Sequence, residues 1–216
     1  MELGRERYGL ALLLILASIV FIMAAGDGPW ARVVATTLQA LAVVASLRAA
    51  GIGRRYRYPL AVLIGVALLV SYGQAIVTGE VNSKLFEGGT LTLILVATPA
   101  IAVGLVRQAT RRGRATLHTM LGVLCIYLLI SLGFAAGYGL IEAVSGEPFF
   151  NQGAEWDTLS NYLYYSLTTI TTFGIGDFSP ASDAGRAVTA AEALLGQIYV
   201  VTVVALIVSN LLLRRN

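Results

Sequence analysis

The sequence has 216 residues, of which 57% are hydrophobic and 12% charged, and its mean hydropathy is +0.78. These values exclude a soluble globular protein of ordinary composition. The formal charge of +3 does not indicate nucleic-acid binding, because the basic residues lie in short clusters between apolar segments. The single cysteine, Cys125, excludes a disulfide framework or a cysteine zinc site within one chain. We therefore predict a membrane protein.

Six apolar segments are long enough to cross a bilayer as helices, since a hydrocarbon core of about 30 Å needs about 20 apolar residues. A shorter, semi-apolar stretch at about 158–171 lies between the last two segments. We predict an all-α membrane protein with six transmembrane helices and one re-entrant pore helix. The six segments run approximately over 8–25, 31–50, 58–78, 88–107, 117–144 and 184–213.

The first segment also allows a second interpretation. Residues 1–26 could be a cleaved signal peptide, since charges precede an apolar run that ends at Ala24-Ala25-Gly26. The run is long for the core of a signal peptide and adequate for a tilted membrane span. We favour a retained helix.

The charged residues predict the orientation, because Lys and Arg accumulate on the cytoplasmic side of short loops. With a cytoplasmic N-terminus, only Arg32, Lys84 and Arg186 fall on the external side. We predict a multi-pass protein of the plasma membrane, surrounded by membrane lipids, with both termini cytoplasmic. Scarce lysine beside many arginines favours a prokaryotic inner membrane. The cytoplasmic basic residues are Arg5, Arg7, Arg48, Arg54, Arg55, Arg57, Arg107, Arg111, Arg112, Arg114, Arg214 and Arg215.

The chain divides into two predicted domains. Residues 1–114 would form four transmembrane helices, which is the number and position of a voltage-sensor domain. The fourth helix, Leu91 to Arg107, has no arginine before its cytoplasmic end, whereas a voltage sensor needs several spaced positive charges within the membrane. We predict a domain without gating charges. Residues 115–216 would form the second domain, with an outer helix at about 115–144, a pore helix at about 158–171, a filter at 172–177 and an inner helix at about 184–213.

The predicted filter lies in Ser166-Leu-Thr-Thr-Ile-Thr-Thr-Phe-Gly-Ile-Gly-Asp-Phe-Ser-Pro180. A cation in a narrow pore must exchange water oxygens for protein oxygens, and rings of backbone carbonyls supply them. Carbonyls that point to one axis need a backbone of alternating handedness, which Gly174 and Gly176 permit because glycine reaches positive φ easily. Thr172 would add its carbonyl and hydroxyl, and Asp177 would brace the loop from behind.

A re-entrant loop also predicts oligomerisation. Irregular backbone at membrane depth is tolerated only where it lines water or is buried in protein. One loop cannot encircle an ion, whereas four loops around an axis can. We therefore predict a homotetramer, in which each chain has three identical subunits as partners.

This stretch resembles the signature of tetrameric potassium channels, Thr-x-x-Thr-Val-Gly-Tyr-Gly-Asp, and the resemblance spans about residues 117–213. Tyr164 and Tyr165 stand where the family places pore-helix aromatics, and Gly196 falls at its inner-helix hinge. The resemblance implies a channel, with no enzymatic activity and no cofactor, that conducts potassium ions passively. These ions would bind at Thr172, Phe173, Gly174 and Ile175, with Gly176 completing the filter.

The sequence departs from the family pattern at the filter. Phe173 replaces valine and Ile175 replaces tyrosine, so the phenol that ties the family's filter to surrounding aromatics is missing. Thr168 stands where the family often has a pore-helix acid. We hypothesise that Asp177 instead accepts a hydrogen bond from Tyr164 or Trp156.

The inner helix contributes further candidates. Glu192 is an acid within a membrane segment, which is a functional candidate by default. It could tune the field behind the filter, or it could equally be a satisfied structural acid near the outer interface. Val200, Val204 and Val208 lie one turn apart on one face and could form a hydrophobic gate that closes by dewetting, or they could simply pack against other helices.

Three other functions stay open from the sequence alone. A weakly selective channel that passes sodium and potassium is motivated by Phe173 and Ile175. A secondary transporter would show internal repeats and broken helices in matching halves, whereas only one interrupted region is present. A non-conducting partner subunit would carry no current when purified alone.

Overall fold

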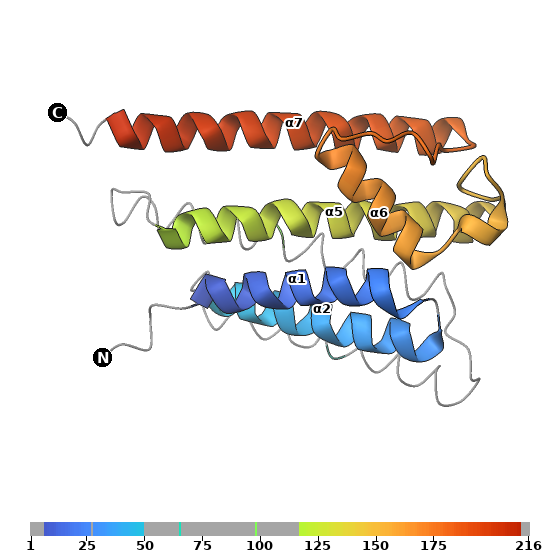
Figure 1. The fold of residues 1–216 in the computed structure, drawn as a ribbon, viewed down its shortest axis with the longest axis horizontal. Helices are drawn as coiled ribbons and strands as arrows, with labels where there is room; N and C mark the ends of the chain where they lie inside the picture. Colours follow the sequence, from blue (N-terminus) through green and yellow to red (C-terminus); the bar gives the residue numbers. More distant parts are fainter. Residues whose placement is uncertain (1–6, 27, 50–64, 66–97, 99–116, 213–216) are drawn as a thin grey trace.

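The computed structural model of the chain describes residues 7–26, 28–49, 65, 98 and 117–212 (Figure 1). Within these ranges the protein consists of helices and connecting loops, with one isolated antiparallel bridge between Phe150 and Pro180. The predicted spans 58–78 and 88–107, apart from single residues, lie outside the described part. Of the predicted four-helix domain, the structure therefore describes the first two helices.

Helices α1 (Arg7–Ala25) and α2 (Pro29–Ala49) form an antiparallel hairpin. The chain turns at Gly26, whose φ of 69° suits glycine, and α2 begins with proline, which lacks the amide that the first turn leaves unbonded. The two helices bury residues spaced three or four apart, many of them small, so their axes approach closely. The buried residues include Ala11, Ile15, Ile22, Ala35, Val43 and Leu47.

The second half of the chain contains two long helices and one short one. Helix α5 runs from Leu117 to Ser145 and α7 from Asp183 to Leu212, and with 30 residues α7 is about 45 Å long. Helix α6, Leu159–Ile170, has 12 residues and a length of about 18 Å, which is too short to cross a bilayer. The helix predicted at about 158–171 therefore has Thr158 and Thr171 as its caps.

The helices are arranged in layers (Figure 1). Helix α5 lies between the α1–α2 hairpin and α7, and α6 crosses obliquely between α5 and α7. After α6 the chain turns back, and an extended segment returns alongside α7 to the end from which α6 started. Because α6 enters and the following segment returns to the same side, this part of the fold is re-entrant.

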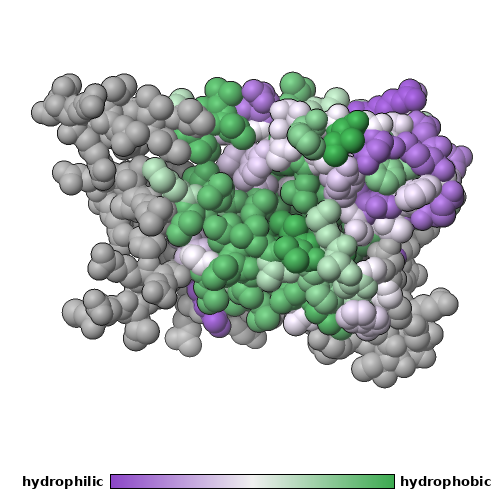
Figure 2. Space-filling model, viewed as in Figure 1, coloured by the Kyte–Doolittle hydropathy of each residue, from purple (hydrophilic) through white to green (hydrophobic). Residues whose placement is uncertain are grey.

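The distribution of apolar residues is typical of a membrane protein. Three helices of the described part are long and apolar enough to cross a bilayer, over Tyr8–Ala25, Trp30–Arg48 and Met120–Ser145. The face seen in Figure 2 is hydrophobic in its middle, and hydrophilic residues gather at the end that carries the loops before α6 and before α7. The chain is therefore an α-helical membrane protein.

A cluster of aromatic rings fixes the loop between α5 and α6. The ring of Tyr138 on α5 lies 4.7 Å from that of Phe149, and Phe150 stacks on Tyr162 of α6 at 5.5 Å. Phe150 also lies 4.7 Å from Phe178, which follows the predicted filter. The cluster thus joins the outer helix, the short helix and the filter exit in one buried unit.

Asp157 closes this loop just before α6. Its carboxylate accepts hydrogen bonds from the main-chain amides of Phe149 at 2.8 Å and Phe150 at 3.2 Å. The next residue, Thr158, caps α6 through its hydroxyl, which accepts from the amide of Asn161 at 3.1 Å. The start of α6 is therefore fixed to the aromatic cluster.

We predict that Asp157→Ala lowers the stability of the protein. Two amides would lose their acceptor, which costs about 1–3 kcal/mol and lowers the melting temperature by about 2–4 °C per kcal/mol. Thermal unfolding of the purified protein in detergent measures the change. Glu147→Ala, at an exposed acid of the same loop, is the matched control and should leave the melting temperature unchanged. Equal melting temperatures for all three proteins would contradict the assigned role.

Candidate functional site

Helix α6 ends in a Schellman motif that starts the predicted filter. The amide of Thr172 donates to the carbonyl of Thr169 at 2.9 Å, and the amide of Phe173 donates to that of Thr168 at 2.9 Å. Gly174 also donates to Thr168, at 3.1 Å. The carbonyl of Thr168 therefore anchors two filter amides, whereas its hydroxyl bonds back to Tyr165 at 2.9 Å. Within this protomer, Thr168 therefore supports the predicted filter through its main-chain carbonyl and not through its side chain.

The filter backbone has positive φ at every second residue. The angles are 58° at Thr172, 50° at Gly174 and 81° at Gly176. The glycine spacing predicts the second and third positions, but not Thr172, the one described residue other than glycine with positive φ. A β-branched residue pays a steric cost in this region, and such strain is concentrated at functional sites.

The carbonyl groups of this segment are free. Among the described residues, no donor bonds to the main-chain oxygens from Thr172 to Gly176. All these residues are exposed in the single chain, including the large apolar side chains of Phe173 at 71% and Ile175 at 55%. Exposed main-chain oxygens without a protein donor are available to water or to a ligand.

Asp177 is braced by residues on two sides. Its main-chain carbonyl accepts a hydrogen bond from Gln152 Nε2 at 2.6 Å, and its carboxylate accepts from the amide of Phe178 at 3.1 Å. The two predicted donors to this carboxylate, Tyr164 and Trp156, both pack their rings against Phe178, at 6.0 Å and 5.9 Å. A hydrogen bond from either side chain to Asp177 stays a prediction.

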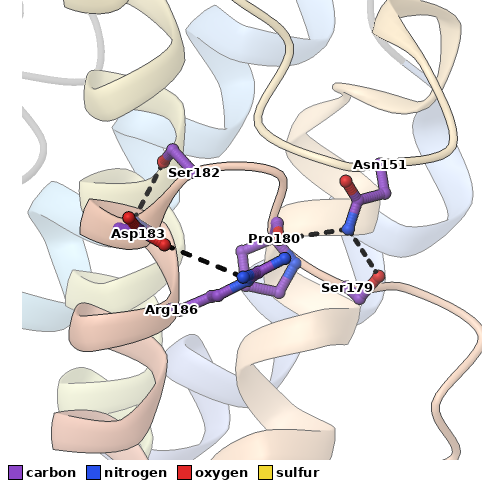
Figure 3. Close-up of polar contacts among 7 residues, drawn as sticks. Asn151, Ser179, Pro180, Ser182, Asp183 and Arg186 are labelled. Atoms are coloured by element: carbon purple, nitrogen blue, oxygen red, sulfur yellow. Dashed lines mark hydrogen bonds and ion pairs between the residues drawn. The ribbon is translucent and has the colours of Figure 1, made fainter.

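The segment after the filter is held by the loop before α6 (Figure 3). Asn151 Nδ2 donates to Ser179 Oγ at 3.1 Å and to the carbonyl of Pro180 at 3.2 Å. Asp183 and Arg186 form an exposed ion pair at 3.7 Å at the start of α7. Asn151 and Gln152 are supporting residues that the sequence did not reveal, because only the folded loop places them beside the filter exit.

The C-terminal end of α6 is wedged between α5 and α7. A Cβ atom added at Gly196 would lie 2.4 Å from the carbonyl oxygen of Ile170, so only glycine allows this approach. The same oxygen accepts a hydrogen bond from the Tyr127 hydroxyl of α5 at 2.8 Å. Helix α7 continues through Gly196 without a break. Its hinge role stays a prediction, and its structural role here is close packing.

The predicted gate residues lie further along α7. Val200 is exposed in the single chain. The side chains of Val204 and Val208 lie outside the described part, so the hydrophobic gate stays a prediction.

Glu192 is fully buried between three helices. The Tyr138 hydroxyl of α5 donates to its Oε2, and its Oε1 is hydrogen-bonded to Ser166 Oγ of α6. Ser166 in turn contacts Ser131 of α5, with 2.8 Å to the carbonyl oxygen and 2.8 Å to Oγ. The sequence singled out Glu192 as an acid within a membrane segment, but its burial and its partners depend on the packing of α5, α6 and α7.

A short re-entrant helix that presents a loop of free carbonyls between two long helices defines a pore-loop membrane protein. Residues 123–212 match the protein family described as Ion channel, and these residues include most of α5, all of α6 and α7, and the predicted filter. Over this segment the chain is similar to the ion-channel family, in agreement with its resemblance to potassium channels. No curated protein and no solved structure matches the chain.

We predict that Gly196→Ala disrupts the pore. The added methyl group would force α7 away from the end of α6, since overpacking of a close contact costs about 1–3 kcal/mol. We expect reduced ion flux in liposomes that contain equal amounts of protein. Gly137→Ala on α5 is the matched control, because a Cβ there meets nothing within 4 Å. Equal flux for Gly196→Ala and Gly137→Ala would show that the close approach is unimportant.

We also predict that Tyr164→Phe weakens the support of Asp177. Loss of one hydrogen bond should lower the potassium-over-sodium permeability ratio about two- to fivefold. Trp156→Phe tests the other candidate donor, because phenylalanine can keep the ring contact with Phe178 and removes the indole N–H. Reversal potentials in mixed ions measure both variants. If the double variant Tyr164→Phe, Trp156→Phe retained wild-type activity and selectivity, neither side chain would brace Asp177.

Proposed function

We propose that the protein conducts potassium ions passively across the plasma membrane through a pore formed by four identical chains. The observation that carries this proposal is the row of unbonded carbonyls from Thr172 to Gly176 on a backbone with alternating positive φ. Such oxygens replace the hydration shell of a cation when several copies surround one axis. The ion-channel family of residues 123–212 supports the same function at the level of class.

The exposed apolar surface supports the tetramer. Phe173 and Ile175 project from the loop into the surroundings of the single chain. Helix α7 exposes a stripe of large apolar side chains at Leu194, Ile198 and Val201. In a tetramer the neighbouring chains cover the loop, and the free carbonyls line a narrow axial path. The irregular backbone is then buried in protein or faces water, as a membrane requires.

In the proposed pore, the ions bind mainly to main-chain oxygens of Thr172, Phe173, Gly174 and Ile175. The C-terminal end of α6 points into the protein and carries the partial negative charge of the helix dipole. In the proposed pore this charge stabilises a cation that lies next to the filter. Side chains in the filter set the spacing of the oxygens more than they bind ions. The chain's part in conduction is therefore to hold its carbonyls at a fixed spacing.

A weakly selective channel for sodium and potassium is the second candidate. It is favoured by Phe173 and Ile175, because neither side chain offers a hydrogen bond that would fix the filter. Potassium selectivity then requires support from the main chain and from the residues behind the loop. The amides that bind Thr168 and the Gln152 contact to Asp177 supply such support in the protomer.

The conducting ion and the class of transport are tested by recording from the purified protein in planar bilayers. A reversal potential that follows the potassium gradient under bi-ionic conditions supports the proposal. A reversal potential near zero favours the weakly selective channel. Flux that saturates at low turnover with obligatory ion coupling would indicate a transporter. Assembled protein without current would indicate a partner subunit. Native mass spectrometry determines whether four chains assemble.

We predict that Gly174→Ala strongly reduces conduction while the protein still folds. Alanine at φ 50° is strained by about 1–2 kcal/mol, and relief of the strain turns the carbonyl away from the axis. Gly146→Ala, at φ 71° in the loop after α5, carries the same strain outside the filter and is the matched control. We expect potassium flux to fall more than about tenfold in Gly174→Ala alone. Equal flux in both variants would place the conduction path elsewhere.

A further inference from the structure

We propose that Glu192 is a positioning residue for the filter, and that it acts as a neutral carboxylic acid which ties α6 to α5 and α7. The proposal deepens the proposed function and rests on it for its effect on conduction. Its structural claim is that the Glu192 carboxyl group carries a proton. This claim can be tested without measuring an ion current. Glu192 lies 18 residues after Gly174 in the chain and is not part of the filter motif.

The position of Glu192 makes it the central contact between three helices. Its side chain is 0% exposed and comes from α7. One carboxyl oxygen meets Tyr138 of α5, and the other meets Ser166 of α6. A second link between α6 and α7 lies beside it, where the Tyr165 hydroxyl donates to Thr189 Oγ1 at 3.3 Å.

Counting protons assigns the protonation state. Four hydrogen-bond contacts join this network: Tyr138 to Glu192, Glu192 to Ser166, Ser166 to the Ser131 carbonyl, and Ser166 Oγ to Ser131 Oγ. The hydroxyl groups of Tyr138, Ser166 and Ser131 supply one proton each. A carboxylate supplies none, so one contact would bring two oxygens to hydrogen-bond distance with no proton between them.

A neutral carboxyl group completes the network. Glu192 then donates from Oε1 to Ser166, which donates to the Ser131 carbonyl and accepts from Ser131 Oγ, while Tyr138 donates to Glu192 Oε2. Every proton has one acceptor, and Ser166 uses both lone pairs and its own proton. A buried polar network is stabilising when all its members are satisfied in this way.

Among the described residues around Glu192, no ion pair neutralises a carboxylate. The titratable groups that face Glu192 are the phenols of Tyr127 and Tyr138 on α5 and of Tyr165 on α6. In the described part of the chain, no lysine or arginine forms an ion pair with it, and Arg186 of the same helix pairs with Asp183 at the surface. An unpaired buried charge is costly, so desolvation favours the neutral acid as the proton count does.

The network reaches the filter through α6. Ser166 lies just over half a helical turn before Thr168, whose carbonyl binds the amides of Phe173 and Gly174. Gly196 lies one turn after Glu192 on α7 and contacts Ile170 at the end of α6. A displacement of α6 at Ser166 would therefore move the first filter carbonyls. Glu192 keeps this helix at one distance from the other two.

Infrared difference spectroscopy of the full-length protein tests the proton directly. We expect the spectrum of wild type minus Glu192→Gln to contain the carbonyl stretch of a protonated carboxylic acid. Carboxylate bands without that stretch would overturn the proposal. The result does not depend on conduction, so it decides the structural claim even if the protein carries no current.

Variants test the effect on the filter. Glutamine reproduces the neutral acid, because its amide donates to Ser166 and its oxygen accepts from Tyr138. We expect Glu192→Gln to retain the potassium-over-sodium permeability ratio, and Glu192→Ala and Ser166→Ala to lower it about tenfold. Ser46→Ala removes a buried hydroxyl of α2, which bonds to the Ala42 carbonyl at 2.8 Å, and is the matched control for Ser166→Ala. It should leave the ratio unchanged.

Three results separate this proposal from the proposed function. A wild-type protein that assembles but does not conduct would refute the channel and leave the infrared test standing. A conducting wild type whose selectivity is lost in Glu192→Gln would refute the neutral acid. If Glu192→Ala fails to assemble, Ser166→Ala decides, and an unchanged permeability ratio in that variant would refute the positioning role.

Discussion

The main-chain oxygens from Thr172 to Gly176 are the constraint on which the rest of this structure depends, because they have no donor among the described residues. At membrane depth a peptide carbonyl must meet protein, water or an ion, since lipid offers no partner. Unless the surrounding structure prevents it, a loop of this kind folds back so that its exposed oxygens accept hydrogen bonds from nearby donors. The Schellman motif at the end of α6 and the glycines at alternate positions keep the chain extended beyond the helix. The fold around the loop therefore keeps these oxygens free of protein donors.

That restraint is distributed over the whole length of α6. Its first turn is fixed by the Thr158 cap and by Asp157, whose carboxylate joins the start of the helix to the aromatic cluster. Its middle is fixed by Ser166, through Ser131 and Glu192. Its last residue, Ile170, lies against Gly196 and accepts a hydrogen bond from Tyr127. A helix held at its start, middle and end has little freedom to tilt. The loop that depends on it inherits this rigidity.

The sequence predicts the parts of this arrangement that follow from local rules. Apolar runs give α1, α2, α5 and α7 to within a few residues, and the short semi-apolar stretch gives α6. Gly174 and Gly176 reveal where positive φ is needed, because glycine spacing is visible in one dimension. The positive φ of Thr172 is missed, since its conformation is imposed by the helix end and not by its residue type. Gln152 and the partners of Glu192 are missed for another reason: their contacts join residues 25 or more positions apart, which no spacing rule indicates.

The filter side chains explain why support from behind the loop matters in this chain. Ile175 and Phe173 have no polar atom, so neither can fix a carbonyl ring through a hydrogen bond of its own. The spacing of the oxygens must then come from other contacts, which are the two main-chain amides on the Thr168 carbonyl and the side-chain amide of Gln152 on the Asp177 carbonyl. Both ends of the filter are thus held by groups that do not line it. Because the first of these anchors belongs to α6, the proposed positioning of α6 by Glu192 would act on the ion path through the Thr168 carbonyl. In the proposed pore, discrimination between ions would therefore depend on helix packing behind the loop more than on the side chains within it.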